Sequence, residues 1–271
     1  MYVGVDIGGT KTLVAALDNA GVIVEKMRFA TPPEYGAFLA ELEGTIDKLT
    51  GHEFRAGCVA APGKIDHEKG VVTHLGSLKW EYVPLQADAE KLLNCPVLLE
   101  NDAKLAGLSE SKLLPANKRV LYITISTGIG TGFIHNQHIV EELRDIEGGQ
   151  MLLDFQGRRK AWEDFASGSA IVKRFGKKAA DIQDSTTWRR IAHDLSQGFI
   201  ELIAITQPEI IVIGGSVGKY LDRYKDFLLE EIKKYNNPLL STPEIREAAR
   251  PDDAVLYGCY DLASEKYGTI A

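Results

Sequence analysis

The sequence has few of the residues that form covalent or metal cross-links. It contains three cysteines, at positions 58, 95 and 259, and none of them belongs to a CxxC pair. This spacing is not that of a disulfide framework or of a cysteine-rich zinc site. No apolar run reaches the ~18 residues of a membrane span, and the first residues enter a strand pattern with no signal peptide before them. These absences predict a cytoplasmic protein with no membrane partner.

Positive charge is also scarce. Lysine and arginine together number 31 against 38 acidic residues, which gives a net charge of −7 and a pI near 5.5. This balance argues against a nucleic-acid partner. The 271 residues are 45% hydrophobic and 25% charged, which is typical of a globular protein with room for two lobes.

The first dozen residues carry the strongest signal. Residues 2–7 form an apolar run typical of a buried strand, and a glycine-rich turn follows it directly. A carboxylate at Asp6 is costly in such a strand unless it is paired or faces a cation. We therefore expect Asp6 to face a Mg²⁺-nucleotide, and the turn to hold phosphate oxygens. The turn residues are Gly8, Gly9, Thr10 and Lys11. The alternative is an ordinary hairpin with an exposed acid and lysine.

The second half of the chain begins like the first. Residues 119–126 predict a strand that enters the glycine-rich turn 127–132, and a hairpin around residues 136–137 follows. We interpret this as an internal duplication with a boundary near Pro115. The predicted architecture is mixed α/β with two lobes, 1–115 and 116–252, and a C-terminal helix at about 253–271 that joins the first lobe. We further expect helices at 35–49, 85–93, 103–113, 161–176, 187–206 and 220–234, and strands at 56–61, 96–99, 209–213 and 245–248. Irregular chain is expected at 64–85, with a short strand at 71–72, and at 141–157.

Three glycine-rich turns follow predicted strands. Ligands of α/β sheets bind beyond the carboxyl ends of strands, so we expect these turns to line one cleft. Thr127 and Gly128 would bind a second phosphate, and Gly214 and Gly215 would let an adenosine lie against the backbone. None of the turns has the spacing of a P-loop or of a dinucleotide fingerprint, which disfavours an oxidoreductase.

A fourth candidate is the run Glu-Asn-Asp-Ala at residues 100–103, where a strand meets a helix. Asp102 could be the N-cap of that helix. In a kinase the same carboxylate would accept the proton of a substrate hydroxyl as it attacks the γ-phosphate. Asn101 can donate and accept hydrogen bonds, which suits a sugar hydroxyl.

Taken together, these runs resemble the ROK family, the repressors, open reading frames and kinases of the sugar-kinase/actin/Hsp70 superfamily. The resemblance spans nearly the whole chain and rests on DIGGTK at 6–11, ENDA at 100–103, STGIGTG at 126–132, EGGQ at 147–150, WEDFASG at 162–168 and IGGS at 213–216. It implies a two-lobed, ribonuclease H-like fold of the actin/hexokinase type, with the active site in a cleft between lobes. The implied activity is ATP-dependent phosphorylation of a hexose or an N-acylhexosamine, assisted by Mg²⁺.

The resemblance also implies roles for single residues. Asp102 would be the general base, and Asp6 would assist Mg²⁺, through water. The implied phosphate and nucleotide contacts are Gly8, Gly9, Thr10, Lys11, Thr127, Gly128, Gly214 and Gly215, and the implied sugar contacts are Gly63, Asn101, Asp102, Glu147, Gln150 and Glu163. For Glu147 and Glu163 the alternative is that both are solvated acids.

The chain departs from the family pattern at two places. Gln150 stands where the family commonly has a histidine, and the cysteine-rich stretch that usually follows it is missing from residues 151–162. We therefore expect no zinc site, and a loop held by packing through Trp162 and Phe165. At the second place, Gly76 replaces an asparagine that contacts the sugar, with Ser77 as a substitute.

Four functions remain open at this stage. The first is a kinase for a hexose, with glucose foremost. The second is a kinase for an N-acetylhexosamine or N-acylmannosamine, because Gln150 and Gly76 leave room for an acyl group. The third is a sugar-responsive repressor, disfavoured by the acidic chain, and the fourth is a kinase homologue that binds sugar and nucleotide without turnover. Family members are often dimers, so the expectation includes a homodimer.

Overall fold

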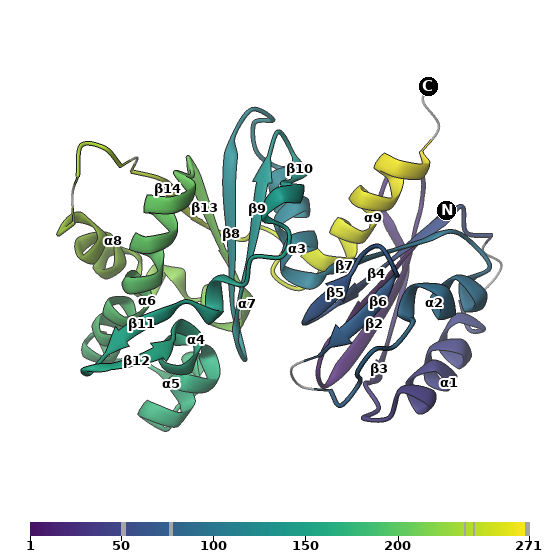
Figure 1. Cartoon of the computed structure of the whole chain (residues 1–271), viewed down its shortest axis with the longest axis horizontal. Coiled ribbons are helices and arrows are strands. Elements are labelled where there is room, and N and C mark those ends of the chain that lie inside the picture. The colour runs from purple at the N-terminus through teal and green to yellow at the C-terminus, as the bar shows by residue number, and fades with distance from the viewer. Residues whose placement is uncertain (50–52, 76–77, 236, 241, 269–271) are drawn as a thin grey trace. The chain divides into compact units, whose positions relative to one another are not determined.

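The structure is a computed structural model that describes residues 1–49, 53–75, 78–235, 237–240 and 242–268. The chain divides into two compact units, shown in Figure 1. Unit 1 comprises residues 1–109 and 252–271, and unit 2 comprises residues 110–251. Gly76 and Ser77, which the sequence analysis singled out, lie outside the described residues.

Unit 1 is built on a five-stranded sheet of order β3-β2-β1-β4-β7. The three strands β1, β2 and β3 are antiparallel, whereas β1, β4 and β7 are parallel. The strands are β1 (Tyr2–Ile7), β2 (Lys11–Leu17), β3 (Ile23–Ala30), β4 (Ala56–Ala61) and β7 (Val97–Asn101), and β5 (Lys64–Asp66) and β6 (Val71–His74) form a separate hairpin. The helices are α1 (Tyr35–Ile46), α2 (Leu85–Leu93), α3 (Asp102–Ser111), which ends just inside unit 2, and α9 (Ala254–Tyr267).

Both faces of the unit 1 sheet are covered, because side chains alternate between them along β1. Val3, Val5 and Ile7 pack in the core formed with α1 and α2. Tyr2 faces the opposite side, where its ring meets the Tyr260 ring of α9 edge-on at 5.3 Å. The alternation places Asp6 on this second side, with α9 and the start of α3.

Unit 2 repeats this plan around a sheet of order β10-β9-β8-β13-β14. Its first three strands are antiparallel, and β8, β13 and β14 are parallel. The strands are β8 (Arg119–Ile125), β9 (Ile129–His135), β10 (His138–Ile139), β13 (Ile210–Gly214) and β14 (Glu244–Glu247), with a separate hairpin of β11 (Leu152–Phe155) and β12 (Arg158–Ala161). The helices are α4 (Trp162–Ala166), α5 (Gly168–Phe175), α6 (Ser185–Thr206), α7 (Gly215–Gly218) and α8 (Lys225–Lys233), with 3₁₀ turns η1 (Glu141–Leu143), η2 (Gly148–Gln150), η3 (Ala179–Asp181) and η4 (Leu221–Arg223).

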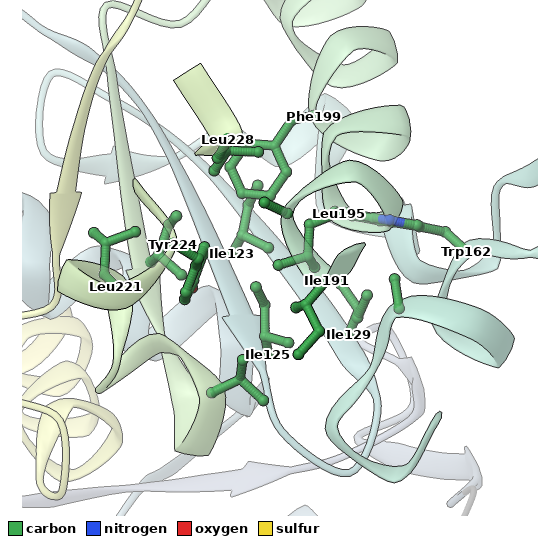
Figure 2. Close-up of a cluster of buried hydrophobic side chains, with 14 of the residues drawn as sticks. Ile123, Ile125, Ile129, Trp162, Ile191, Leu195, Phe199, Leu221, Tyr224 and Leu228 are labelled. Carbon is green, nitrogen blue, oxygen red and sulfur yellow. The ribbon is translucent and has the colours of Figure 1, made fainter. Parts of the chain in front are cut away.

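The core of unit 2 joins the sheet to α4, α6 and α8. Figure 2 shows the buried side chains of β8 and β9 facing those of α6, with Trp162 of α4 among them. Trp162 is fully buried and meets the Phe199 ring edge-on at 5.9 Å. The short helix α4 is therefore anchored in the main core of this unit.

The two sheets confirm the predicted repeat of strand, turn and hairpin, because their strand orders and directions correspond. Several local predictions were wrong. The turn predicted at 127–132 is shorter, because β9 already begins at Ile129. The helix predicted at 161–176 is two helices separated at Ser167, whose hydroxyl accepts from the Ala170 N–H and caps α5. The short strand predicted at residues 71–72 is confirmed as part of β6, but the stretches otherwise predicted to be irregular also contain β5 and part of the β11–β12 hairpin.

Candidate functional site

The turn between β1 and β2 exposes backbone N–H groups. The Gly8 N–H donates to the Lys11 carbonyl at 3.0 Å and closes a two-residue turn. Thr31 holds this turn from β3's side, since its hydroxyl donates to the Gly8 carbonyl at 2.7 Å and its N–H to the Thr10 carbonyl at 3.1 Å. Among the described residues no partner is recorded for the N–H groups of Gly9 and Thr10, which are exposed. Exposed N–H donors at a tight turn suit phosphate oxygens.

Two carboxylates of unit 1 lie close enough to influence each other. Burial, the nearby negative charge of Asp102 and, more weakly, that of Asp253 raise the pKa of Asp6 to about 7, although Lys11 opposes the shift. Burial also raises the pKa of Asp102. The charge of Asp102 disfavours the charged form of Asp6, so a cation at this place would be favoured. This is the electrostatic setting expected for a Mg²⁺-nucleotide and a general base.

The residue that caps α3 is Asn101 rather than Asp102. The Asn101 Oδ1 accepts from the N–H groups of Ala103, at 3.0 Å, and Lys104, at 3.4 Å. The sequence placed the strand end at Leu99, but β7 runs on to Asn101, which shifts the cap by one residue. Asp102 is then the first residue of the helix, where its carboxylate accepts from the adjacent Ala103 N–H at 2.8 Å. Since the Asn101 oxygen is committed to the cap, its amide offers a substrate donors only.

Gly63 follows β4 in a conformation that favours glycine, with φ of +91°. A Cβ here would overlap with the His74 carbonyl of β6, so glycine lets the β5–β6 hairpin approach the sheet. The Gly63 carbonyl lies 3.5 Å from the Asn101 Nδ2. Within unit 1 the structure therefore brings these two predicted sugar contacts together.

In unit 2 the turn between β8 and β9 is joined to two other loops by Ser126. The Ser126 carbonyl accepts from the Gly168 N–H at 2.7 Å, and its hydroxyl accepts from the Ser216 N–H at 2.9 Å. A pocket of about 600 Å³ opens beside these loops. It is lined by Ser126, Thr127, Gly168, Ser169, Val172, Lys173, Lys178, Ala179, Ala180, Ser216, Val217, Lys219 and Tyr220. Three lysines and several hydroxyls give it the character of a site for an anionic ligand.

Of the predicted nucleotide contacts in unit 2, Thr127 lines this pocket, whereas Gly128, Gly214 and Gly215 are not among its lining residues. The two later glycines have a packing role. A Cβ on Gly214 would overlap with the Tyr122 hydroxyl, and Gly215 has φ of +84° with the Ile125 carbonyl 2.5 Å from its Cβ position. They let the end of β13 lie against β8, which places Ser216 and Val217 at the pocket.

Two predicted sugar contacts of unit 2 form one hydrogen-bonded unit. Glu163 accepts from the Gln150 Nε2 at 2.7 Å through one carboxylate oxygen, and from the Ile129 N–H at 3.1 Å through the other. That second oxygen leaves no room for a Cβ at Gly128, which would lie 2.6 Å away. Glu147 is exposed and precedes η2. Glu163 is thus an anchored carboxylate rather than the solvated acid of the alternative.

Among the described residues there is no group of three or more histidines, cysteines, aspartates or glutamates placed to hold a metal ion. Nor does this part of the chain contain a helix that is long and apolar enough to cross a membrane. The segment after Gln150, where the family has a cysteine-rich stretch, is the hairpin β11–β12. Its Phe155 stacks on Phe165 of α4 with ring centroids 4.5 Å apart.

Sequence reasoning missed the lysines of the pocket and the bridging role of Ser126. The pocket takes Lys173 from α5, Lys178 from the residue before η3 and Lys219 from the residue after α7. No local sequence pattern brings these three lysines together. Ser126, Gly168 and Ser216 each stand within one of the glycine-containing runs that carried the family resemblance. That shared position is the signal that could have marked them.

The order and directions of the strands define a mixed α/β protein with the actin/hexokinase-like fold. Its architecture is close to that of a ROK family glucokinase from Streptomyces griseus crystallised with glucose and AMPPNP, with a TM-score of 0.83 and 24% identity over 97% of this chain and 99% of that one. The model of the ROK family matches residues 2–266. This chain belongs to the ROK family.

Two curated relatives have different substrates in their names. A glucokinase of Streptomyces coelicolor is 26% identical over 98% of this chain and 98% of its own length. An N-acetylmannosamine kinase of Yersinia pestis is 29% identical over 80% of this chain and 84% of its own length. The comparisons thus support a sugar kinase and leave its sugar unresolved.

Proposed function

We propose that this protein is an ATP-dependent carbohydrate kinase that phosphorylates a hydroxyl of a hexose, with glucose as the foremost substrate. The observation that carries the proposal is the arrangement in unit 1. A turn with exposed N–H groups adjoins two carboxylates, Asp6 and Asp102, whose pKa values are raised. Membership of the ROK family and the similarity to sugar kinases support the same reading.

The turn Gly8–Lys11 would hold phosphate oxygens through its N–H groups and the ammonium of Lys11. In unit 2, Thr127 and Gly128 would bind further phosphate oxygens, and the backbone at Gly214 and Gly215 would border the adenosine. The ~600 Å³ pocket supports the assignment at Thr127, which lines it, because the lysines of the pocket complement the charge of a nucleotide.

Magnesium fits the oxygen ligands of unit 1. Burial disfavours the charged carboxylate of Asp6 when no cation is near. Mg²⁺ commonly binds one carboxylate together with water and substrate phosphates. When bound with ATP, Mg²⁺ neutralises charge that develops on the phosphate oxygens. Asp6 would assist it through water. No zinc has a place in the proposal.

The chemical step falls to Asp102. Its carboxylate accepts the proton of the sugar hydroxyl while the hydroxyl oxygen attacks the γ-phosphorus, and ADP leaves. The raised pKa of this acid brings it nearer to that of an efficient base at neutral pH. Gly63, Asn101, Glu147, Gln150 and Glu163 would orient the sugar. The proposed substrates are small molecules. The proposed setting is the cytoplasm without nucleic acid, and the proposed assembly is a homodimer.

A second candidate substrate is an N-acylated hexosamine such as N-acetylmannosamine. Two observations favour it: the similarity to an N-acetylmannosamine kinase, and an amide in place of an imidazole at Gln150. The Gln150 Nε2 is engaged by Glu163, so its carbonyl oxygen is the group left to accept a hydrogen bond from an acyl N–H.

The test is ADP release from Mg²⁺-ATP with glucose, mannose, fructose, N-acetylglucosamine, N-acetylmannosamine or no sugar. We expect release that depends on the sugar and is fastest with glucose. Preference for N-acetylmannosamine would select the second candidate. If folded protein that still binds ATP released no ADP with any of the sugars, the proposal would be contradicted. That result would favour a homologue that binds sugar and nucleotide without turnover.

A further inference from the structure

The short helix α4 depends on contacts with other elements for its position and orientation. It has five residues, Trp162–Ala166, and a helix of this length leaves its last carbonyls without partners inside the helix. It nevertheless carries Glu163, whose two oxygens bind Gln150 and the Ile129 N–H. Something outside α4 must therefore fix the orientation of that carboxylate.

Arg174, near the end of α5, makes the required contacts. Its Nη1 donates to the Phe165 carbonyl of α4 at 2.6 Å and to the Asp194 carboxylate of α6 at 2.7 Å. Its guanidinium also lies 4.8 Å from the centre of the Phe155 ring, which in turn stacks on Phe165. One side chain thus connects α4, α6 and the β11–β12 hairpin. A planar guanidinium can donate and stack at the same time, which an ammonium cannot do.

Asp194, the acid that pairs with Arg174, is buried. The Asp194 side chain is 7% exposed, and burial raises its pKa although Arg174 opposes the shift. The charges that face Asp194, besides Arg174, are those of His193 and Arg190 on its own helix. The Asp194 carbonyl accepts from the Trp162 Nε1 at 3.4 Å. Losing Arg174 would therefore leave a buried acid without its partner beside the residue that precedes Glu163.

We propose that Arg174 is a positioning residue for the sugar site, which holds α4 so that Glu163 presents its carboxylate in a fixed orientation. This proposal rests on the proposed function, because it assigns Glu163 to the sugar. The turn between β8 and β9, which is proposed to bind phosphate, depends less on Arg174. Ile129 is also paired with Ile125 in the β8–β9 ladder, and the Ser126 N–H donates to the Gly128 carbonyl at 2.9 Å.

Arg174 lines a pocket of about 630 Å³ that is separate from the lysine-lined one, and this permits chemical rescue. The variants are R174A, R174K and, as a matched control, R189A. Arg189 lines the same pocket and also forms an ion pair, with Glu230 of α8, but both side chains of that pair are 55% exposed, and the ring that Arg189 covers is Phe227 of α8. Methylguanidinium is the probe, with methylammonium at equal concentration as its control.

We expect R174A to raise the KM for the sugar at least tenfold while kcat and the KM for ATP change less than threefold. Methylguanidinium should lower the sugar KM again, and methylammonium should not. R174K should recover only part of the loss, and R189A should stay within twofold of the wild type. An unchanged sugar KM in R174A, or equal rescue by both ions, would overturn the proposal.

A readout without activity separates this proposal from the proposed function. The indole N–H of Trp162, assigned by W162F, should shift in ¹⁵N NMR spectra of R174A and return with methylguanidinium. A wild type with no sugar-dependent ADP release would contradict the proposed function. An indole signal that R174A leaves unmoved would contradict the positioning role of Arg174, whether or not the enzyme turns over.

Discussion

The contact between α4 and α6 gives the sharpest stability prediction. Gly198 lies in the middle of α6, where a Cβ would overlap with Cδ2 and Cε2 of Trp162 and lie 2.7 Å from its Cε3. Trp162 is fully buried, and its rigid ring sits against Phe199, so it has no flexible end that could retreat. Figure 2 shows this ring within the cluster of unit 2.

The size of the effect follows from two opposed terms. Alanine gains about 1 kcal/mol over glycine in a helix interior, whereas overpacking a core costs about 1–3 kcal/mol, and overlap with a fixed ring belongs at the upper end. We therefore expect G198A to lose a net ~2 kcal/mol, equivalent to roughly 4–8 °C in Tm. Urea and thermal unfolding followed by near-UV circular dichroism measure it.

Gly36 of α1 is the matched control, because a Cβ there meets nothing within 4 Å. G36A should be unchanged or more stable by up to about 1 kcal/mol. In a W162F background the cost of G198A should shrink, since the smaller ring leaves room for the methyl group. Equal or greater stability of G198A than of wild type would refute the described packing of α4 on α6.

Three further predictions concern the proposed base Asp102, the turn Gly8–Lys11 and the cap of α6. D102N should retain ATP binding but lose ~10²–10⁴-fold in kcat, and activity near wild type would exclude Asp102 as the base. T31V should raise the KM for ATP several-fold, because the Gly8 carbonyl loses the Thr31 hydroxyl, and T31S should restore it. Hydrogen bonds from Thr187 lower the pKa of the α6 cap Asp184, so its contribution to stability is full above pH ~4 and lost as pH falls further. The difference in Tm between D184A and wild type should therefore shrink between pH 6 and pH 3, and a constant difference would contradict this.

Much of the fold could be predicted from the sequence, because its buried strands are continuous apolar runs. The strand at residues 56–61 and the helix at residues 85–93 were predicted with the bounds that the structure shows. Each signal was local: an apolar run or a helical period, ended by glycine, proline or asparagine. The same local signals, repeated in the second half, predicted the duplication of strand, turn and hairpin, and the matching orders of the two sheets confirm it.

The errors lie where long-range contacts decide a local outcome. Both Asn101 and Asp102 can cap a helix, and only the length of β7 selects Asn101. The apolar pattern runs through Ser167, but the bond from the Gly168 N–H to the Ser126 carbonyl helps to end α4 there. The β11–β12 hairpin did have a local signal, because Gln156 and Gly157 form a turn with positive φ.

The candidate site was predictable in its residue types and less so in its connections. The turn Gly8–Lys11 and the two acids of unit 1 stand in runs whose chemistry can be read locally. The bond between Gln150 and Glu163 joins segments 13 residues apart, and the contacts of Arg174 with Phe165 and Asp194 join three helices. Pairings of this kind depend on tertiary packing, which no period or propensity reports.

The central claim, transfer of the γ-phosphoryl group from ATP to a sugar with Asp102 as the base, can be tested in one measurement. Wild type and D102N are incubated with Mg²⁺, with ATP labelled with ¹⁸O on the γ-phosphate, and with either glucose or N-acetylmannosamine. The labelled products are identified and quantified by mass spectrometry. The account predicts a labelled sugar phosphate from the wild type, formed at least ~10²-fold more slowly by D102N. Label found only in inorganic phosphate, or equal rates for the two proteins, would contradict it.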